Sequence, residues 1–256
     1  MLRHRVIPIL LLHNDGLVKT KKFLDPIYLG DPINAINIFN DKEVDELVFL
    51  DIDATKYNKS IDFKLIEDIA QECFMPFAYG GGIKTIEEVE RLFTIGVEKV
   101  IINTALHNKD LILEAISKFG SQSIVASVDI KKDDSAKYKV YSYVNKNTLD
   151  NDLLEYIKEL EALHIGEILI NNVDNDGIQK GYDIEIMNTL SQSVKIPMIA
   201  CGGASSLDDM KNIIKYTKVS AVAAGSLFVF YGVHNAVLIT YPKYKELEKI
   251  LEYKHA

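Results

Sequence analysis

The sequence has few cysteines, no tryptophan and a deficit of basic side chains. Its 256 residues include 2 Cys, 6 Pro and 14 Gly, and 29 Lys and Arg stand against 37 Asp and Glu. The resulting net charge of −8 is opposite in sign to that of proteins that bind the phosphate backbone of nucleic acids. We therefore expect no nucleic-acid partner.

Long apolar runs and cysteine clusters are also missing. Cys73 and Cys201 cannot build a disulfide framework, and neither belongs to a Cys/His cluster with metal-ligand spacing. We expect a reducing, cytoplasmic setting and neither a metal nor another cofactor. Val6–Leu12 imitates the apolar part of a signal peptide, but it runs directly into His13-Asn14-Asp15-Gly16 without a small-residue cleavage site. No run reaches membrane length, so no membrane contact is expected.

Short apolar runs are what the sequence has in abundance. Helix-period segments separate them, and one of these starts with a possible capping box, Thr85 and Glu88, and stops at Gly96. Continuously apolar strands that alternate with amphipathic helices predict a parallel sheet covered by helices, and eight such units predict a closed (β/α)8 barrel, the α/β fold known as a TIM barrel. The eight runs are Arg5–Leu12, Glu46–Asp51, Met75–Tyr79, Glu98–Ile102, Ile124–Asp129, Glu167–Ile170, Pro197–Ala200 and Ser220–Ala224.

Features of the first half of the chain return about 120 residues later. Such a repeat is expected of two fused four-unit half-barrels. We predict one TIM-barrel domain over residues 1–256, with half-barrels at about 1–122 and 123–256. The matched pairs are Gly80–Thr85 with Cys201–Ser206, Ile101–Leu106 with Ala223–Phe228, and Phe49–Asp53 with Asn171–Asp176.

Glycine pairs follow a strand and precede a capped helix in both halves. For one such pair, a tight turn is the commoner explanation. Two matched sets instead favour phosphate binding, because bare backbone N–H groups at a helix N-terminus attract anions. Small or hydroxyl-bearing residues at Asn103–Ala105 and Gly225–Ser226 would complete each cradle. The pattern predicts a substrate with a phosphate group at each end.

Acidic residues also gather at predicted strand ends, where barrel enzymes place catalytic groups. Asp51, Asp53, Asp174 and Asp176 belong to this set, although helix capping is the commoner role for any single Asp. Asp129, which ends the strand beginning at Ile124, is the best candidate for a general acid or base.

Four charged residues stand at the opposite ends of predicted strands: Arg5, Glu46, Lys99 and Glu167. If they point to the barrel axis, they form a charge-balanced ring at the N-terminal mouth, because an unpaired charge there would be costly. Solvated strand starts would explain the same pattern.

Together these motifs resemble the cyclase subunit of imidazole glycerol phosphate synthase, the HisF-like family, over essentially the whole chain. The resemblance implies a glutaminase (HisH-like) partner on the N-terminal face and ammonia that passes the ring of four charges to the C-terminal face. The motifs that carry it are Phe49–Asp53, Gly80–Ile83, Ile102–Ala105, Gly166–Leu169, Asp176–Gly177, Gly181–Asp183 and Ile199–Ala204.

The resemblance also implies roles for individual residues. Asp129 matches one of two catalytic aspartates, and Arg5, Glu46, Lys99 and Glu167 match the ammonia-channel ring. Two sets of residues would hold the phosphates of a small-molecule substrate or effector: Gly82, Asn103 and Thr104 for one, and Asp176, Gly177, Gly203, Gly225 and Ser226 for the other.

Three positions depart from the family pattern. The other catalytic aspartate falls on Leu11, which cannot transfer a proton, and Asn171 and Asn172 replace hydroxyl residues. Loss of one of two acid/base groups usually costs about 10²–10⁴-fold in rate. Autonomous cyclase turnover is therefore expected to be impaired, unless His13 or Asp15 takes over.

A closer resemblance, to the WbuZ-type branch, is carried by Tyr28–Ala35, Phe39–Leu47 and Phe228–Pro242. It implies a subunit of a glutamine amidotransferase complex that supplies ammonia, with a separate sugar amidotransferase as partner, for amidation of a surface-sugar precursor. The alternatives are the lyase-type cyclase subunit of histidine biosynthesis and a non-catalytic scaffold that binds its partner. The basic segment Lys19–Ile33 is expected to form a loop at the active-site face.

Overall fold

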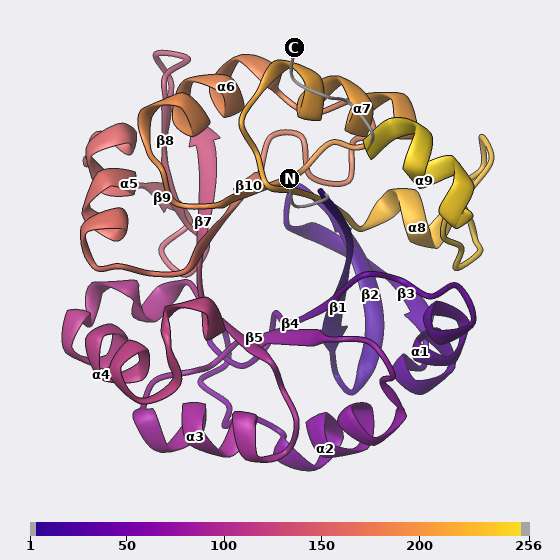
Figure 1. The fold of residues 1–256 in the computed structure, drawn as a ribbon, viewed down its shortest axis with the longest axis horizontal. Coiled ribbons are helices and arrows are strands. Elements are labelled where there is room, and N and C mark those ends of the chain that lie inside the picture. The colour runs from indigo at the N-terminus through magenta and orange to yellow at the C-terminus, as the bar shows by residue number, and fades with distance from the viewer. Residues whose placement is uncertain (1–3, 252–256) are drawn as a thin grey trace.

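The computed structural model describes residues 4–251, which form a ring of parallel strands surrounded by helices (Figure 1). The barrel strands pair in the order β10-β11-β12-β1-β4-β5-β6-β7, and pairing of β10 with β7 closes the ring. The predicted TIM barrel is confirmed, whereas the division into half-barrels stays a prediction. The eight barrel strands are β1 (Arg5–His13), β4 (Leu47–Asp51), β5 (Phe77–Gly80), β6 (Lys99–Ile102), β7 (Ile124–Lys132), β10 (Glu167–Asn172), β11 (Met198–Cys201) and β12 (Ala221–Ala224).

Helices follow the barrel strands and cover their outer faces (Figure 1). None of the helices within residues 4–251 is long and apolar enough to cross a bilayer. The α-helices are α1 (Pro32–Asp41), α2 (Phe63–Glu72), α3 (Ile86–Thr94), α4 (Lys109–Phe119), α5 (Leu153–Ala162), α6 (Ile184–Ser193), α7 (Leu207–Tyr216), α8 (Ser226–Val229) and α9 (Tyr244–Leu251), and the 3-10 helices are η1 (Thr104–His107) and η2 (Ser121–Ser123).

Side-chain caps fix where the helices begin. The predicted capping box at Thr85 and Glu88 is present at α3, and Ser206 with Asp209 forms the equivalent box at α7. Gly96 follows the end of α3 with a φ of +108°, a conformation that favours glycine. These caps anchor the turns that connect the strand ends to the helices.

The barrel strands are apolar on both faces, because one face packs on the helices and the other fills the barrel. The outer layer is the larger core, and Phe39, Phe49 and Tyr79 are among its fully buried members. The inner cluster consists of smaller side chains: Ile7, Ile9, Val48, Ala78, Ile101, Val125, Leu169, Ile199, Cys201, Ala221 and Ala223, with Leu11 and Leu50 packed against it.

The predicted loop at Lys19–Ile33 is wrong. Antiparallel strands β2 (Gly16–Lys21) and β3 (Leu24–Gly30) extend β1 into a sheet at the C-terminal side of the barrel. Apolar Leu17 and Val18 are buried, which gives β2 a reason to pair with β1. Two further pairs of antiparallel strands lie outside the barrel. They are β8 (Tyr138–Ser142) with β9 (Asn147–Thr148), and β13 (Phe230–Tyr231) with β14 (Ala236–Val237).

Candidate active site

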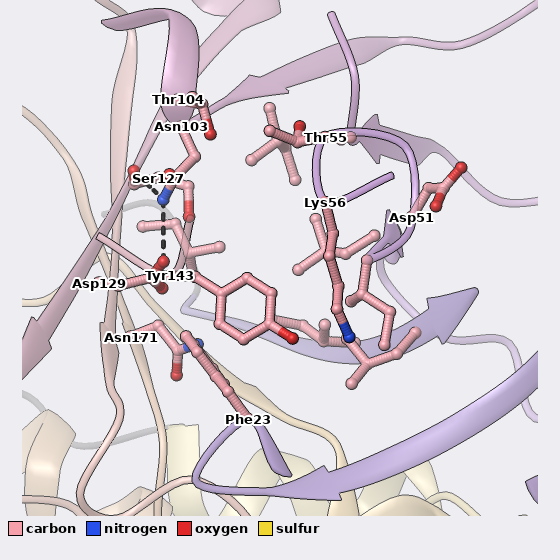
Figure 2. Close-up of a pocket in the computed structure, with 18 of the residues that line it drawn as sticks. Phe23, Asp51, Thr55, Lys56, Asn103, Thr104, Ser127, Asp129, Tyr143 and Asn171 are labelled. Atoms are coloured by element: carbon pink, nitrogen blue, oxygen red, sulfur yellow. Dashed lines mark hydrogen bonds between the residues drawn. The ribbon is translucent and has the colours of Figure 1, made fainter. Parts of the chain in front are cut away.

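A pocket of about 190 Å³ opens at the carboxyl ends of the barrel strands (Figure 2). Barrel enzymes place their reactive groups at this end of the strands. The floor of the pocket is apolar and includes Ile9 and Leu169, which also belong to the inner cluster. Polar side chains lie above that floor. Asn103, Asp129 and Asn171 form the polar wall, as Figure 2 shows.

Asp129 lies near the end of β7 and faces this pocket. Asn103 donates a hydrogen bond from Nδ2 to Oδ2 of Asp129 at 3.0 Å, and Asn171 lies opposite Asp129 in the register of β10 with β7. Burial raises the pKa of Asp129 to about 7, against the opposing effect of Asn103 and Asn171. A carboxyl group with this pKa can exchange a proton near neutral pH.

The first predicted phosphate cradle lies on one side of Asp129. Gly82 has a φ of +71°, and a Cβ atom added there would lie 2.7 Å from Cβ of Ala54, so the position requires glycine. Thr104 begins η1 directly after Asn103, and both line the pocket with Gly82. The Asn103 carboxamide is already bound to Asp129 and to the Ser127 carbonyl, so its backbone is the part left for an anion.

The second predicted cradle surrounds a small cavity beside the main pocket. Gly177, Gly203, Gly225 and Ser226 line it together. A side chain at Gly203 would collide with the carbonyl oxygen of Gly181. The Oγ atom of Ser226 is buried and has no hydrogen-bond partner in the structure.

Asp176 also lines this cavity, and its carboxylate has a buried lysine partner. Its carboxylate binds Nζ of Lys19 at 2.7 Å, and the Thr20 hydroxyl donates to it at 3.4 Å. Asp176 thus holds the buried Lys19 ammonium beside Gly225, while its contact with a phosphate stays a prediction. Lys19 was not among the predicted site residues. Its signal was the Asn14-Asp15-Gly16 sequence between two apolar runs, which is typical of a hairpin.

The four predicted ring residues meet at the other end of the barrel. Arg5 bridges Glu46 and Glu167, and Lys99 does the same, with Nζ 2.9 Å from Glu46 and 3.3 Å from Glu167. Both carboxylates are buried, and their charges raise the pKa of Arg5 although burial alone would lower it. The ring is thus closed by ion pairs, and its two positive and two negative charges balance.

Comparison with known proteins places the chain in a family. A model described as "Histidine biosynthesis protein" matches residues 5–235. The chain belongs to this family, as a HisF-like protein. It is 52% identical over 249 residues to a Pseudomonas aeruginosa protein provisionally named imidazole glycerol phosphate synthase subunit hisF2. The aligned region covers 97% of this chain and 99% of that protein. It is 36% identical over 233 residues to the imidazole glycerol phosphate synthase subunit HisF of Streptococcus sanguinis, covering 91% of this chain and 92% of that protein.

Leu11 lines the pocket of this HisF-like protein, together with Leu50 on the neighbouring strand. The proposed substitutes do not reach the pocket: Nδ1 of His13 lies 2.7 Å from Oδ1 of Asp53 in an adjacent cleft, which Asp15 also lines. One wall of the pocket is therefore apolar where the opposite wall carries Asp129.

The other strand-end aspartates have structural partners. Oδ1 of Asp51 accepts hydrogen bonds from the backbone N–H groups of Asp53 and Ala54, and Asp51 points away from the centre of the pocket in Figure 2. Asp174 accepts a hydrogen bond from the backbone of Lys132. Neither contact is a helix cap: Asp51 binds the turn that follows β4, and Asp174 binds the end of β7.

Aromatic side chains at the mouth of the pocket were also not foreseen. Phe23, from the turn between β2 and β3, packs edge-on against Tyr143 with ring centroids 5.8 Å apart. Nζ of Lys56 lies 5.9 Å from the same Tyr143 ring (Figure 2). The HisF-like barrel thus carries a partial cover over the pocket.

Among residues 4–251, no group of three or more His, Cys, Asp and Glu side chains could hold a metal ion.

Proposed function

We propose that the chain is the cyclase subunit of an imidazole glycerol phosphate synthase, which joins ammonia to a substrate that carries two phosphates. One observation carries the proposal: the Gly82 cradle and the Ser226 cradle flank Asp129 at the carboxyl ends of the barrel strands. Relatives named as subunits of this synthase support the histidine-pathway function at least as well as sugar amidation.

Ammonia is proposed to come from a glutaminase partner bound at the ring face. The barrel interior between the ring and the pocket is lined by apolar side chains such as Ile7, Val48 and Leu169. Neutral ammonia crosses such a layer at far lower cost than ammonium, because burial of an isolated charge is strongly unfavourable. The ring of Arg5, Glu46, Lys99 and Glu167 would then mark the entrance.

Asp129 is proposed to be the acid/base group. A pKa of about 7 leaves it partly protonated at neutral pH, so it can accept a proton from ammonia as the new bond forms and return it to a leaving group. Since Leu11 offers no second carboxylate, Asp129 would serve both proton transfers or share one with the substrate.

The test is turnover of the bisphosphorylated substrate of imidazole glycerol phosphate synthase in ammonium chloride. We expect cyclised product, and a loss of about 10²–10⁴-fold in Asp129→Asn. Asp134→Asn, at an exposed position on the following turn, is the matched control and should keep full activity. Product formation that survives in Asp129→Asn would refute the assignment. Addition of a HisH-like glutaminase should also raise glutamine hydrolysis.

A second candidate is ammonia supply for sugar amidation, as in the WbuZ-type branch, with a separate amidotransferase as acceptor. Leu11 favours it, because an apolar residue in the pocket removes one acid/base group while the ring and cradles remain. The discriminating variant is Leu11→Asp. If only Leu11→Asp forms cyclised product, the result supports amidation. If the unmodified protein forms cyclised product, the result favours the cyclase.

A further inference from the structure

Phe74 lies on the face of the barrel that carries the ring of four charges. It belongs to the turn at residues 73–76, between the end of α2 and the amino end of β5. The N–H of Leu47 donates to the Pro76 carbonyl at 3.0 Å, so this turn lies beside the strand start that follows the ring residue Glu46. The side chain of Phe74 is 85% exposed. Single exposed apolar residues are common, so the meaning of Phe74 depends on how its turn is held and on the charges around it.

The turn is held in place by Asn40, near the end of α1. The Nδ2 group of Asn40 donates to the Glu72 carbonyl at 2.7 Å, and its Oδ1 atom accepts from the Phe74 N–H at 3.1 Å. One carboxamide thus binds the backbone on both sides of Cys73, and the buried side chain of Met75 fixes the next residue of the turn. An exposed ring on a turn held in this way loses little conformational entropy when a partner covers it, which favours its use as an interface anchor.

The charges on the ring face are divided between its two sides. The side of the Phe74 turn is mostly acidic, with Lys42 among the exposed carboxylates of Asp41, Glu43, Glu72 and Glu98. The opposite side carries exposed lysines, because Lys195 and Lys218 precede β11 and β12, which lie across the ring of strands from β5 and β6. Glu161 on that side is engaged, since its carboxylate accepts from the backbone N–H of Lys195. A partner seated over the ring therefore meets opposite charges on its two sides, which selects one orientation.

We propose that Phe74 anchors the glutaminase partner on the ring face, by inserting into an apolar pocket of that partner whose rim is basic. This inference rests on the proposed glutaminase partnership. Ammonia that meets water at the entrance becomes ammonium, so the partner must exclude water around the ring. An aromatic anchor that is covered on docking excludes water from its surroundings. The carboxylates beside Phe74 would attract Lys and Arg side chains of the partner and hold the anchor in register.

Titration calorimetry with a HisH-like glutaminase from the same organism tests the anchor. Phe74→Ser should weaken the affinity about 30-fold or more, as expected of an interface hot spot. It should keep the melting temperature of the unmodified chain, because the Phe74 side chain is exposed. Leu24→Ser is the matched control: Leu24 is 62% exposed on β3, at the opposite end of the barrel, and this variant should bind as tightly as the unmodified chain. Equal affinities of Phe74→Ser and Leu24→Ser would overturn the proposal.

The salt dependence of association tests the basic rim. Glu72→Lys should slow association with the same glutaminase about tenfold at low salt, and the difference from the unmodified chain should disappear at high salt. Glu67→Lys, at an exposed position midway along α2, is the control and should change the association rate little. Equal rates for the two variants, or faster association of Glu72→Lys, would contradict the inference.

The outcomes separate this inference from the function on which it rests. If the unmodified chain binds no HisH-like glutaminase, the proposed partnership fails and the role of Phe74 fails with it. If the unmodified chain binds the glutaminase and Phe74→Ser binds it equally tightly, only the role of Phe74 is refuted. The ammonium-dependent turnover that tests Asp129 needs no glutaminase, so it decides the cyclase function independently of both results.

Discussion

Replacement of Lys99 by methionine should test whether the ring of charges stabilises the barrel. Nζ of Lys99 lies 2.9 and 3.1 Å from the two carboxylate oxygens of Glu46 and 3.3 Å from Glu167. The two glutamates are each only 5% exposed. Lys99→Met would therefore leave two buried carboxylates to share the single guanidinium of Arg5.

Removal of one partner from a buried ion pair costs about 3–5 kcal/mol. The Lys99 side chain is 22% exposed, so solvent screening places the expected loss at the lower end, about 3 kcal/mol. For a chain of this length, that loss lowers the melting temperature by about 6–12 °C.

Denaturant and thermal unfolding, followed by circular dichroism, measure this effect. Lys64→Met is the matched control: Lys64 pairs with Asp68 at 2.7 Å, but the two side chains are 72% and 45% exposed. That variant should lose at most about 0.5 kcal/mol. An equal loss in Lys99→Met and Lys64→Met would refute the claim that the ring is a buried network.

Three further outcomes are expected. Burial raises the pKa of Asp129 from 3.8 to about 7, so between these pH values the folded state holds a proton that the unfolded state has lost. The free energy of unfolding should therefore fall as pH rises from about 4 to about 7. Asp129→Asn should flatten this fall in denaturant unfolding curves recorded at each pH. Lys19→Met should destabilise the fold by about 3 kcal/mol in denaturant unfolding, because it leaves Asp176 buried and unpaired, and should weaken inorganic phosphate binding in calorimetry. Gly82→Ala should lower phosphate affinity and cost about 1–3 kcal/mol in thermal unfolding, through its positive φ and the contact with Ala54.

The barrel was predictable because its physical requirements leave a strong pattern in the sequence. Strands buried on both faces read as continuous apolar runs, and the caps at Thr85 and Ser206 mark where helices start. The β2–β3 hairpin lacked such a pattern. It contains Pro26 and three lysines, which are typical of a solvated loop. Lys19 is buried and Lys21 is exposed, and composition alone could not distinguish the buried lysine from the exposed one.

The site was predictable where a residue acts through the backbone or through its position on a strand. Gly82 and Gly203 need conformations or spaces that only glycine allows, so a glycine after a strand is a local signal. The four ring charges gave a weaker signal, because a solvated strand start has the same sequence. Lys19 depends instead on a partner that the fold brings from a distant turn: Asp176 lies 157 residues from Lys19 in the chain. A salt bridge of that span leaves no local pattern.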